Sequence, residues 1–242
     1  MAESKVALVI GAGAATGGAI ARRFAREGYT ACVTRRGADK LKPLVESIEK
    51  AGGRARAFGS DARREEQVIE LVQTIEREEG PIEVCVFNVG GNVRFPIRET
   101  TLRVYTKVWE MAALAGFLAG REVAKVMVPR GRGTILFTGA TASLRGSKGF
   151  AAFAGAKHAL RALAQSMARE LGPEGIHVAH VVIDGAIDTP FIREMFPERY
   201  ALKDKAGILD PQAIAENYWQ LHCQPRSAWT HELDLRPWIE NW

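Results

Sequence analysis

Seven short apolar runs, separated by longer amphipathic segments, constrain the fold of this 242-residue chain more than any other feature. The longer segments follow a helical period, as in Val68, Leu71, Val72 and Ile75. Strands that alternate with helices predict right-handed crossovers and a parallel sheet covered by helices on both faces. We therefore expect one doubly wound α/β domain over residues 1–242. Its expected strands are 6–10, 30–34, 56–59, 84–88, 134–138, 177–183 and 229–235.

Composition and charge narrow the classes of protein that fit. A chain with 47% hydrophobic and 25% charged residues is typical of a globular domain. The net charge of +5 comes from scattered basic pairs, whereas a nucleic-acid-binding protein concentrates them on one face or tail. No apolar run reaches the roughly 18 residues of a membrane span, and no signal-peptide pattern opens the chain. We expect a cytoplasmic protein with no nucleic-acid or membrane partner.

The positions of the cysteines and histidines indicate the redox compartment and whether a metal site is expected. Cys32 and Cys85 lie inside apolar runs, and with Cys223 they make an odd number. This pattern favours buried free thiols in a reducing compartment over a disulfide framework. No cysteine and histidine pair has metal-ligand spacing, so we expect no metal.

A glycine-rich turn follows the first expected strand. Residues 11–18 read Gly-Ala-Gly-Ala-Ala-Thr-Gly-Gly and lead into an expected helix. Such a turn lets backbone N–H groups approach a pyrophosphate, and the helix N-terminus adds partial positive charge. We expect Gly11 and Gly17 to shape a dinucleotide site. The alternative is a tightly packed turn with no ligand.

The second expected strand ends in Thr34 and is followed by Arg35 and Arg36. Folds that prefer NAD place an acidic residue here to accept the adenosine ribose hydroxyls. Guanidinium groups instead hold a 2′-phosphate with paired hydrogen bonds. The two arginines therefore favour NADP(H) over NAD(H), with solvated surface charge as the alternative.

These motifs resemble those of the short-chain dehydrogenase/reductase family over residues 6–190. Gly11 and Gly17 match the first and last glycines of the family's Gly-x-x-x-Gly-x-Gly pattern, and Ala15 replaces the middle one. Residues 138–143 and 150–160 resemble the family's active-site strand and helix. The resemblance implies a single Rossmann-like domain with a seven-stranded parallel sheet.

The resemblance also implies further cofactor contacts. Asp61 matches the family's aspartate beside the adenine ring, although it could instead be a helix N-cap. Asn88 and Gly90 match the family's Asn-Asn-Ala-Gly turn, although Asn88 could simply form a turn. Thr189 is also expected to contact the cofactor. It follows the position of the family's Pro-Gly turn, which reads Asp184-Gly185 in this chain.

The catalytic positions of the family are altered. Of its asparagine, serine, tyrosine and lysine, only the lysine remains, as Lys157; the other positions are Ala113, Ala140 and Phe153. Phe153 and Ala140 can neither donate nor accept a proton. General acid–base help is worth about 10²–10⁴ in rate, so ordinary carbonyl reduction should suffer. Lys157 is expected to bond the cofactor ribose, with a solvated helical lysine as the alternative.

Several other side chains could border the nicotinamide. Six candidate polar replacements are Arg94, Thr141, Ser143, Ser147, Lys148 and Asp184. The interrupted apolar segment 184–211 is expected to be a substrate lid or binding loop. The expected apolar pocket comprises Val93, Phe95, Leu144, Phe150, Phe153 and Met195.

The C-terminal segment 224–242 is expected to hold the last strand and a tail. It carries Trp229, Trp238 and Trp242, which either cover the core of their own chain or anchor a homodimer or homotetramer.

The sequence thus predicts an NADP(H)-binding oxidoreductase with a non-standard active site, moving a hydride to or from an apolar carbonyl or alcohol. The alternative is a catalytically inactive relative that acts as a nucleotide-binding sensor or scaffold.

Overall fold

The computed structural model describes residues 5–241, so expectations for residues 1–4 and Trp242 lie outside the described part. One seven-stranded parallel sheet has the order β3-β2-β1-β4-β5-β6-β7. The strand order reverses between β1 and β4, with β2 and β3 beyond β1 and with β5, β6 and β7 beyond β4, as the doubly wound prediction requires. The strands are β1 (Val6–Ile10), β2 (Thr30–Arg35), β3 (Arg54–Gly59), β4 (Ile82–Phe87), β5 (Gly133–Thr138), β6 (Ile176–Ile183) and β7 (Glu232–Leu235).

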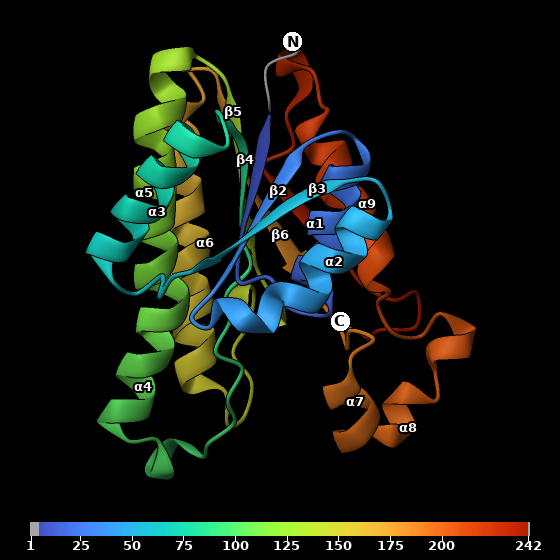
Figure 1. Ribbon diagram of the computed structural model, residues 1–242. Coiled ribbons are helices and arrows are strands. Elements are labelled where there is room, and N and C mark those ends of the chain that lie inside the picture. Colours follow the sequence, from blue (N-terminus) through green and yellow to red (C-terminus); the bar gives the residue numbers. More distant parts are fainter. Residues whose placement is uncertain (1–4, 242) are drawn as a thin grey trace.

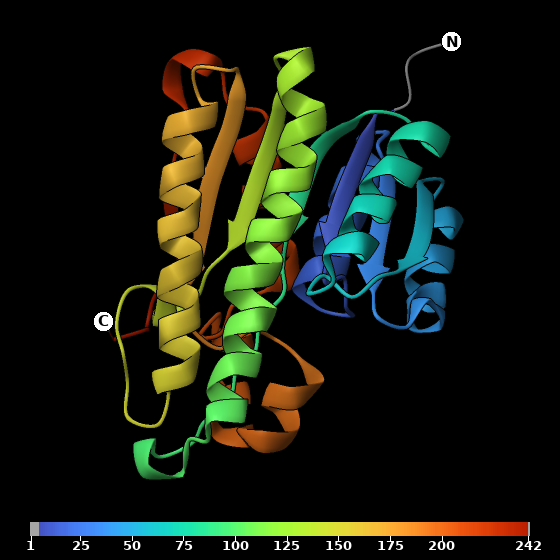
Figure 2. The ribbon, with the colours of Figure 1, turned by 90° about the vertical axis from the view of Figure 1, so that its left-hand side faces the viewer.

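Helices cover both faces of the sheet (Figure 1). One face carries α1 (Thr16–Arg26), α2 (Lys42–Lys50) and α9 (Pro211–His222). The other carries α3 (Glu65–Glu78), α5 (Ala115–Met127) and α6 (Ala151–Leu171), the last two standing side by side in Figure 2. Both cores are apolar because strands buried on two sides are apolar throughout. In α3 the predicted stripe of Val68, Leu71, Val72 and Ile75 is buried.

The last strand is shorter than predicted, because β7 begins at Glu232 rather than at residue 229. Trp229 instead stacks its ring on His177, with centroids 4.9 Å apart and an interplanar angle of 1°. Trp229 therefore covers its own chain. Trp238 is 77% exposed, although its indole N–H donates to the carbonyl of Lys205.

The segment 184–211 is also more regular than predicted. It contains two short helices, α7 (Pro190–Met195) and α8 (Pro197–Tyr200). The prolines that interrupt its sequence lie in the first turn of each helix, where a missing N–H costs nothing. The segment is thus partly helical rather than an irregular loop, and we call α7 and α8 the flap helices.

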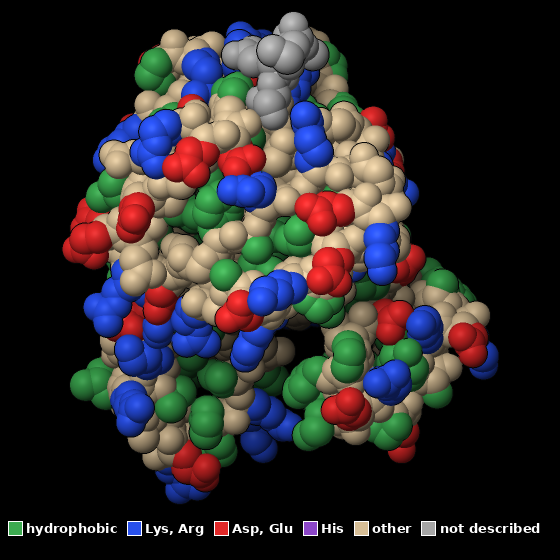
Figure 3. Space-filling view, viewed as in Figure 1, with side chains coloured by type: hydrophobic (Ala, Val, Ile, Leu, Met, Phe, Trp, Pro, Cys, Tyr) green, Lys and Arg blue, Asp and Glu red, His purple; other side chains and the backbone are tan. Residues whose placement is uncertain are grey.

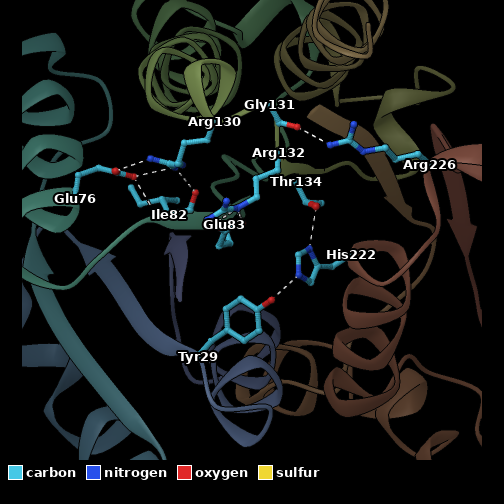
Figure 4. A network of polar contacts seen from close by, with 10 residues as sticks. All are labelled: Tyr29, Glu76, Ile82, Glu83, Arg130, Gly131, Arg132, Thr134, His222 and Arg226. Carbon is cyan, nitrogen blue, oxygen red and sulfur yellow. Dashed lines mark hydrogen bonds and ion pairs between the residues drawn. The ribbon is translucent and has the colours of Figure 1, made fainter. Parts of the chain in front are cut away.

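Polar contacts fasten the amino-terminal edge of the sheet (Figure 4). Arg130 pairs with Glu76 at 2.7 Å and donates to the carbonyl of Ile82. His222 bridges the Tyr29 hydroxyl at 2.7 Å and the Thr134 hydroxyl at 2.9 Å. Apart from Arg130 Nε, which has no hydrogen-bond partner among the described residues, these groups satisfy one another, so the network is structural. The opposite, carboxyl edge is where ligands bind in open sheets of this kind.

The structure also bears on the predictions for the cysteines, for metal binding and for membrane spans. Cys32 and Cys85 are buried free thiols as predicted, while Cys223 is exposed. Within residues 5–241, no cluster of side chains is suited to hold a metal ion. None of the helices in that range has the length and apolar character needed to cross a membrane.

Candidate active site

A cavity of about 770 Å³ lies at the carboxyl edge of the sheet. The loops after β4, β5 and β6 line it together with α6 and the flap helices α7 and α8. Figure 3 shows the molecule hollowed on this side, between the part that contains α4 (Leu102–Trp109) and the part formed by α7 and α8. The predicted cofactor edge and the predicted lid thus enclose one space.

The glycine turn between β1 and α1 packs tightly. Gly11 has φ of +89°, and a Cβ there would come within 2.8 Å of the Asn88 carbonyl oxygen. A Cβ at Gly17 would come within 2.8 Å of the Ala12 Cα and the Gly11 oxygen. Asn88 ties the turn to β4, donating from Nδ2 to the Gly11 carbonyl at 3.2 Å. Both glycines are needed for this close approach.

The turn also presents free backbone donors to the cavity. Ala15, at the N-cap of α1, makes no side-chain capping hydrogen bond, and Thr16, the first residue of the helix, lines the cavity. The first N–H groups of a helix have no partner within it, and the helix dipole favours an anion there. A pyrophosphate fits this position.

Arg35 ends β2 and Arg36 follows it, and both side chains are exposed. Among the described residues neither guanidinium has a hydrogen-bond or ion-pair partner. Arg36 lies close enough to Asp61 to contribute to the lowered pKa of that carboxyl group. The geometry fits both a 2′-phosphate site and solvated charge.

Asp61 is engaged by its neighbour Arg63. The guanidinium donates to Oδ1 at 2.9 Å and to Oδ2 at 2.6 Å, and these bonds lower the pKa of Asp61 to about 2. The N-cap alternative is wrong, because α3 begins at Glu65 with Arg64 at its N-cap. An adenine amino group would have to share the carboxylate with Arg63.

Lys157 lies on α6 and is 3% exposed, so the solvated alternative is wrong. Its ammonium donates to the Thr138 carbonyl at 2.8 Å and to the Val89 carbonyl at 3.3 Å. Burial lowers the pKa of Lys157 to about 8. Gly90 lies beside it, since a Cβ at that glycine would stand 3.9 Å from the ammonium nitrogen. The side chain is held at the cavity wall, where a ribose could meet it.

Phe153 is 8% exposed and belongs to an apolar cluster with Val108, Ala112 and Ala142, against which Ala140 packs. Its ring centroid lies 6.0 Å from the Lys157 ammonium. Ala113 is buried in a π-helical turn, Glu110–Leu114, between α4 and α5. Phe153 and Ala140 thus lie in one apolar cluster, with Phe153 beside the retained lysine, and Ala113 is buried in a separate turn.

A buried carboxylate lies next to these apolar positions. Asp184 is 1% exposed and accepts a hydrogen bond from the Thr141 hydroxyl at 2.5 Å. Guanidinium nitrogens of Arg145 and Arg236 stand 3.6 Å and 3.8 Å from its two oxygens. Its Oδ2 has no hydrogen-bond partner among the described residues. Thr141 itself lines the cavity, so the pair joins a cavity hydroxyl to a buried carboxylate that accepts its hydrogen bond.

The other polar candidates divide into two groups. Ser147 and Arg94 line the cavity as expected. Ser143 is fully buried and its hydroxyl accepts from the Ala140 N–H, while Lys148 is exposed and does not line the cavity. The Thr189 hydroxyl accepts from the Ile192 N–H at 3.1 Å and caps α7, and it also stands outside the lining.

The apolar pocket was predicted only in part. Phe150 and Phe153 line the cavity, but four other expected residues do not: Val93, Phe95, Leu144 and Met195. From the segment that contains α7 and α8, the cavity is lined by Phe191, Ile192 and Phe196 rather than by the predicted Met195. Arg145, Arg199 and Glu240 also line it and were missed. No sequence motif identifies these residues as cavity residues, because they come from three separate segments that meet only in the folded chain.

The strand order and the glycine turn at the switch point define a dinucleotide-binding α/β protein. A family model described as short chain dehydrogenase matches residues 5–199. The chain belongs to the short-chain dehydrogenase/reductase family.

Three individual proteins illustrate the similarity. A short-chain dehydrogenase from Rhodopseudomonas palustris is 51% identical with a TM-score of 0.83, covering 97% of this chain and 99% of that one. Zerumbone synthase from Zingiber zerumbet is 31% identical over 207 residues, 84% of this chain and 76% of its own. A variant of actinorhodin polyketide ketoreductase solved with NADPH is 25% identical with a TM-score of 0.89, covering 99% of this chain and 98% of that one.

Proposed function

We propose that this protein is an NADP(H)-dependent oxidoreductase acting on a carbonyl or alcohol. The observation that carries the proposal is the buried ammonium of Lys157, fixed between the carbonyls of Thr138 and Val89 at the cavity wall. Burying a lysine is costly, and a purely structural helix would be more stable with an apolar residue there. The NADPH in the ketoreductase relative supports the choice of cofactor.

This chain's own residues supply the binding contacts. The glycine turn and the start of α1 would hold the pyrophosphate, and Lys157 would bond the ribose hydroxyls. Arg35 and Arg36 would bind the 2′-phosphate, because their guanidinium groups are exposed and unpaired in the described structure. A bound nicotinamide supplies or accepts the hydride.

We assign the missing proton transfer to Thr141 and Asp184. When the substrate is an alcohol, its hydroxyl proton passes to Thr141 Oγ1 as the threonine proton passes to Asp184 Oδ1, across the 2.5 Å bond. Arg145 and Arg236 offset the cost of burying the Asp184 carboxylate beside the cavity. The pair replaces a tyrosine that Phe153 cannot imitate.

The inactive sensor or scaffold is less well supported than an enzyme. Its argument is the loss of polar groups at Ala113, Ala140 and Phe153, and the Thr141–Asp184 hydrogen bond beside the cavity supports an alternative proton path.

Calorimetry with NADPH, followed by turnover of a carbonyl and alcohol panel, tests the proposal. Thr141→Val should lower kcat by about 10² while leaving NADPH affinity unchanged, and Thr141→Ser should restore most of the rate. Ser147→Ala is the matched control, since it removes another cavity hydroxyl. Absence of NADPH binding refutes the cofactor assignment; an unchanged rate in Thr141→Val refutes the proton path.

A further inference from the structure

We propose that the substrate carries a carboxylate next to an aromatic-sized apolar body. The proposal rests on the oxidoreductase function above and specifies its substrate class. Three arginines from separate segments line the same cavity: Arg94 after β4, Arg145 after β5 and Arg199 on α8. A convergence of guanidinium groups on one space favours an anionic ligand.

The charges of the cavity are unbalanced. Arg145 is partly engaged by the buried Asp184 at 3.6 Å. Arg94 and Arg199 have no hydrogen-bond or ion-pair partner within the described part of the chain. Among the described residues, Glu240 is the one carboxylate that lines the cavity, against these three arginines and Lys157. An added carboxylate would offset the excess positive charge.

The loop that precedes α6 contacts the stem of Arg94, whose side chain is otherwise exposed. The backbone N–H of Phe95 donates to the Gly149 carbonyl at 2.8 Å. The stem of Arg94 packs on Gly149, where an added Cβ would stand 3.0 Å from the Arg94 Cγ. Fixing the stem lowers the entropy that the guanidinium loses on binding an anion.

The expected cofactor phosphates have other groups to bind them, although the pyrophosphate position shares this cavity through Thr16. The pyrophosphate position lies at the start of α1, and the 2′-phosphate position lies beyond β2. Arg94 and Arg199 line the cavity together with aromatic rings of α6 and the flap. Two of those rings, Phe191 and Phe196, contact each other edge to face with centroids 5.9 Å apart.

The aromatic lining defines the rest of the ligand. Phe150, Phe153, Phe191 and Phe196 all line the cavity. Phe191 and Phe196 are 58% and 46% exposed, so an apolar ligand beneath the flap would cover aromatic surface that water now contacts. A neutral apolar substrate would use the rings but leave the arginines unpaired.

Benzoylformate and its methyl ester form a matched pair of probes, because both present an aryl ketone and only the first is an anion. Each would be reduced at its ketone carbon by hydride, with one proton taken up at oxygen and NADPH oxidised to NADP⁺. We expect the acid to have the higher kcat/KM. Arg94→Ala and Arg199→Ala should each raise KM for the acid about tenfold and leave the ester unchanged.

Two exposed arginines outside the cavity provide matched controls. Arg98→Ala controls for Arg94, and Arg193→Ala, on α7, controls for Arg199. Neither should alter KM for either probe. Equal use of acid and ester by the wild type, or equal losses for both in the Arg94 and Arg199 variants, overturns the proposal.

Binding measurements separate this proposal from the proposed function. Calorimetry should detect phenylacetate, and not phenylacetamide, with and without NADPH, and the Arg94 and Arg199 variants should lose that binding. An affinity for NADPH that falls in these variants as much as phenylacetate affinity would assign the arginines to the cofactor and overturn the proposal. Phenylacetate binding without any NADPH binding would refute the oxidoreductase alone.

Discussion

The ammonium of Lys157 donates a hydrogen bond to the carbonyl of Thr138 across 2.8 Å, joining α6 to the last residue of β5. The contact fixes the one retained catalytic-type side chain against the sheet, while Phe153, one turn earlier, lies in apolar packing. In the proposed function this lysine positions the cofactor, and the phenylalanine one turn earlier offers no proton donor.

Gly17→Ala should damage the cofactor turn. The new Cβ would meet backbone atoms at 2.8 Å, and overpacking of this kind costs about 1–3 kcal/mol. We expect a lower melting temperature and about tenfold weaker NADPH binding. Gly13→Ala is the control, because its Cβ would meet nothing within 4 Å. Equal behaviour of the two variants would show that the turn is not tightly packed.

Arg35→Ala with Arg36→Ala should discriminate between the coenzymes. Loss of charge-assisted bonds to a 2′-phosphate should weaken NADPH by about 10- to 100-fold and leave NADH nearly unchanged. Isothermal titration of both coenzymes measures this, with the double variant Arg26→Ala and Lys50→Ala, which also removes two exposed positive charges, as the control. Equal losses for NADPH and NADH would remove the 2′-phosphate assignment.

Phe153→Tyr should introduce a proton donor one helical turn before Lys157. We expect carbonyl reductase activity to rise by about 10² if the ring keeps its place, as general acid catalysis typically provides. NADPH consumption with methyl benzoylformate measures the gain. Phe150→Tyr adds a hydroxyl to another ring of the same cavity and should give none. A failure of Phe153→Tyr to exceed Phe150→Tyr would contradict the geometry.

Stability should fall as the pH is lowered from about 6.5 to about 4. His180 is fully buried, and burial lowers its pKa from 6.5 to about 4 despite its contact with Glu232. In this window the unfolded chain binds a proton that the folded chain refuses, so stability is complete above the unfolded pKa and is lost toward the folded one. The loss amounts to roughly 3 kcal/mol at most.

Urea unfolding at pH 7, 6 and 5 measures this dependence. His180→Gln removes one titrating group and should reduce the dependence. His222, whose pKa burial lowers to about 4, and His177, whose pKa burial also lowers, contribute to what remains. A slope as steep in His180→Gln as in the wild type would show that other groups control acid stability.

Periodicity and spacing were enough to predict most of the fold. Apolar runs and the helical period are local signals, so β1 was predicted to the residue and the α3 stripe was identified. The start of β7 was not, because the stacking of Trp229 on His177 joins residues far apart in the chain. The flap helices were missed because prolines read as interruptions also begin helices.

For the site, the sequence by itself determined the glycine turn, the position of Lys157 and the loss of polar groups at Ala113, Ala140 and Phe153. Only the tertiary structure decided that Lys157 is buried, that Thr141 bonds Asp184, and that Arg94, Arg145 and Arg199 line one cavity. The physical reason is that chemistry of this kind depends on through-space distance and desolvation, which packing of distant segments creates and local sequence does not encode.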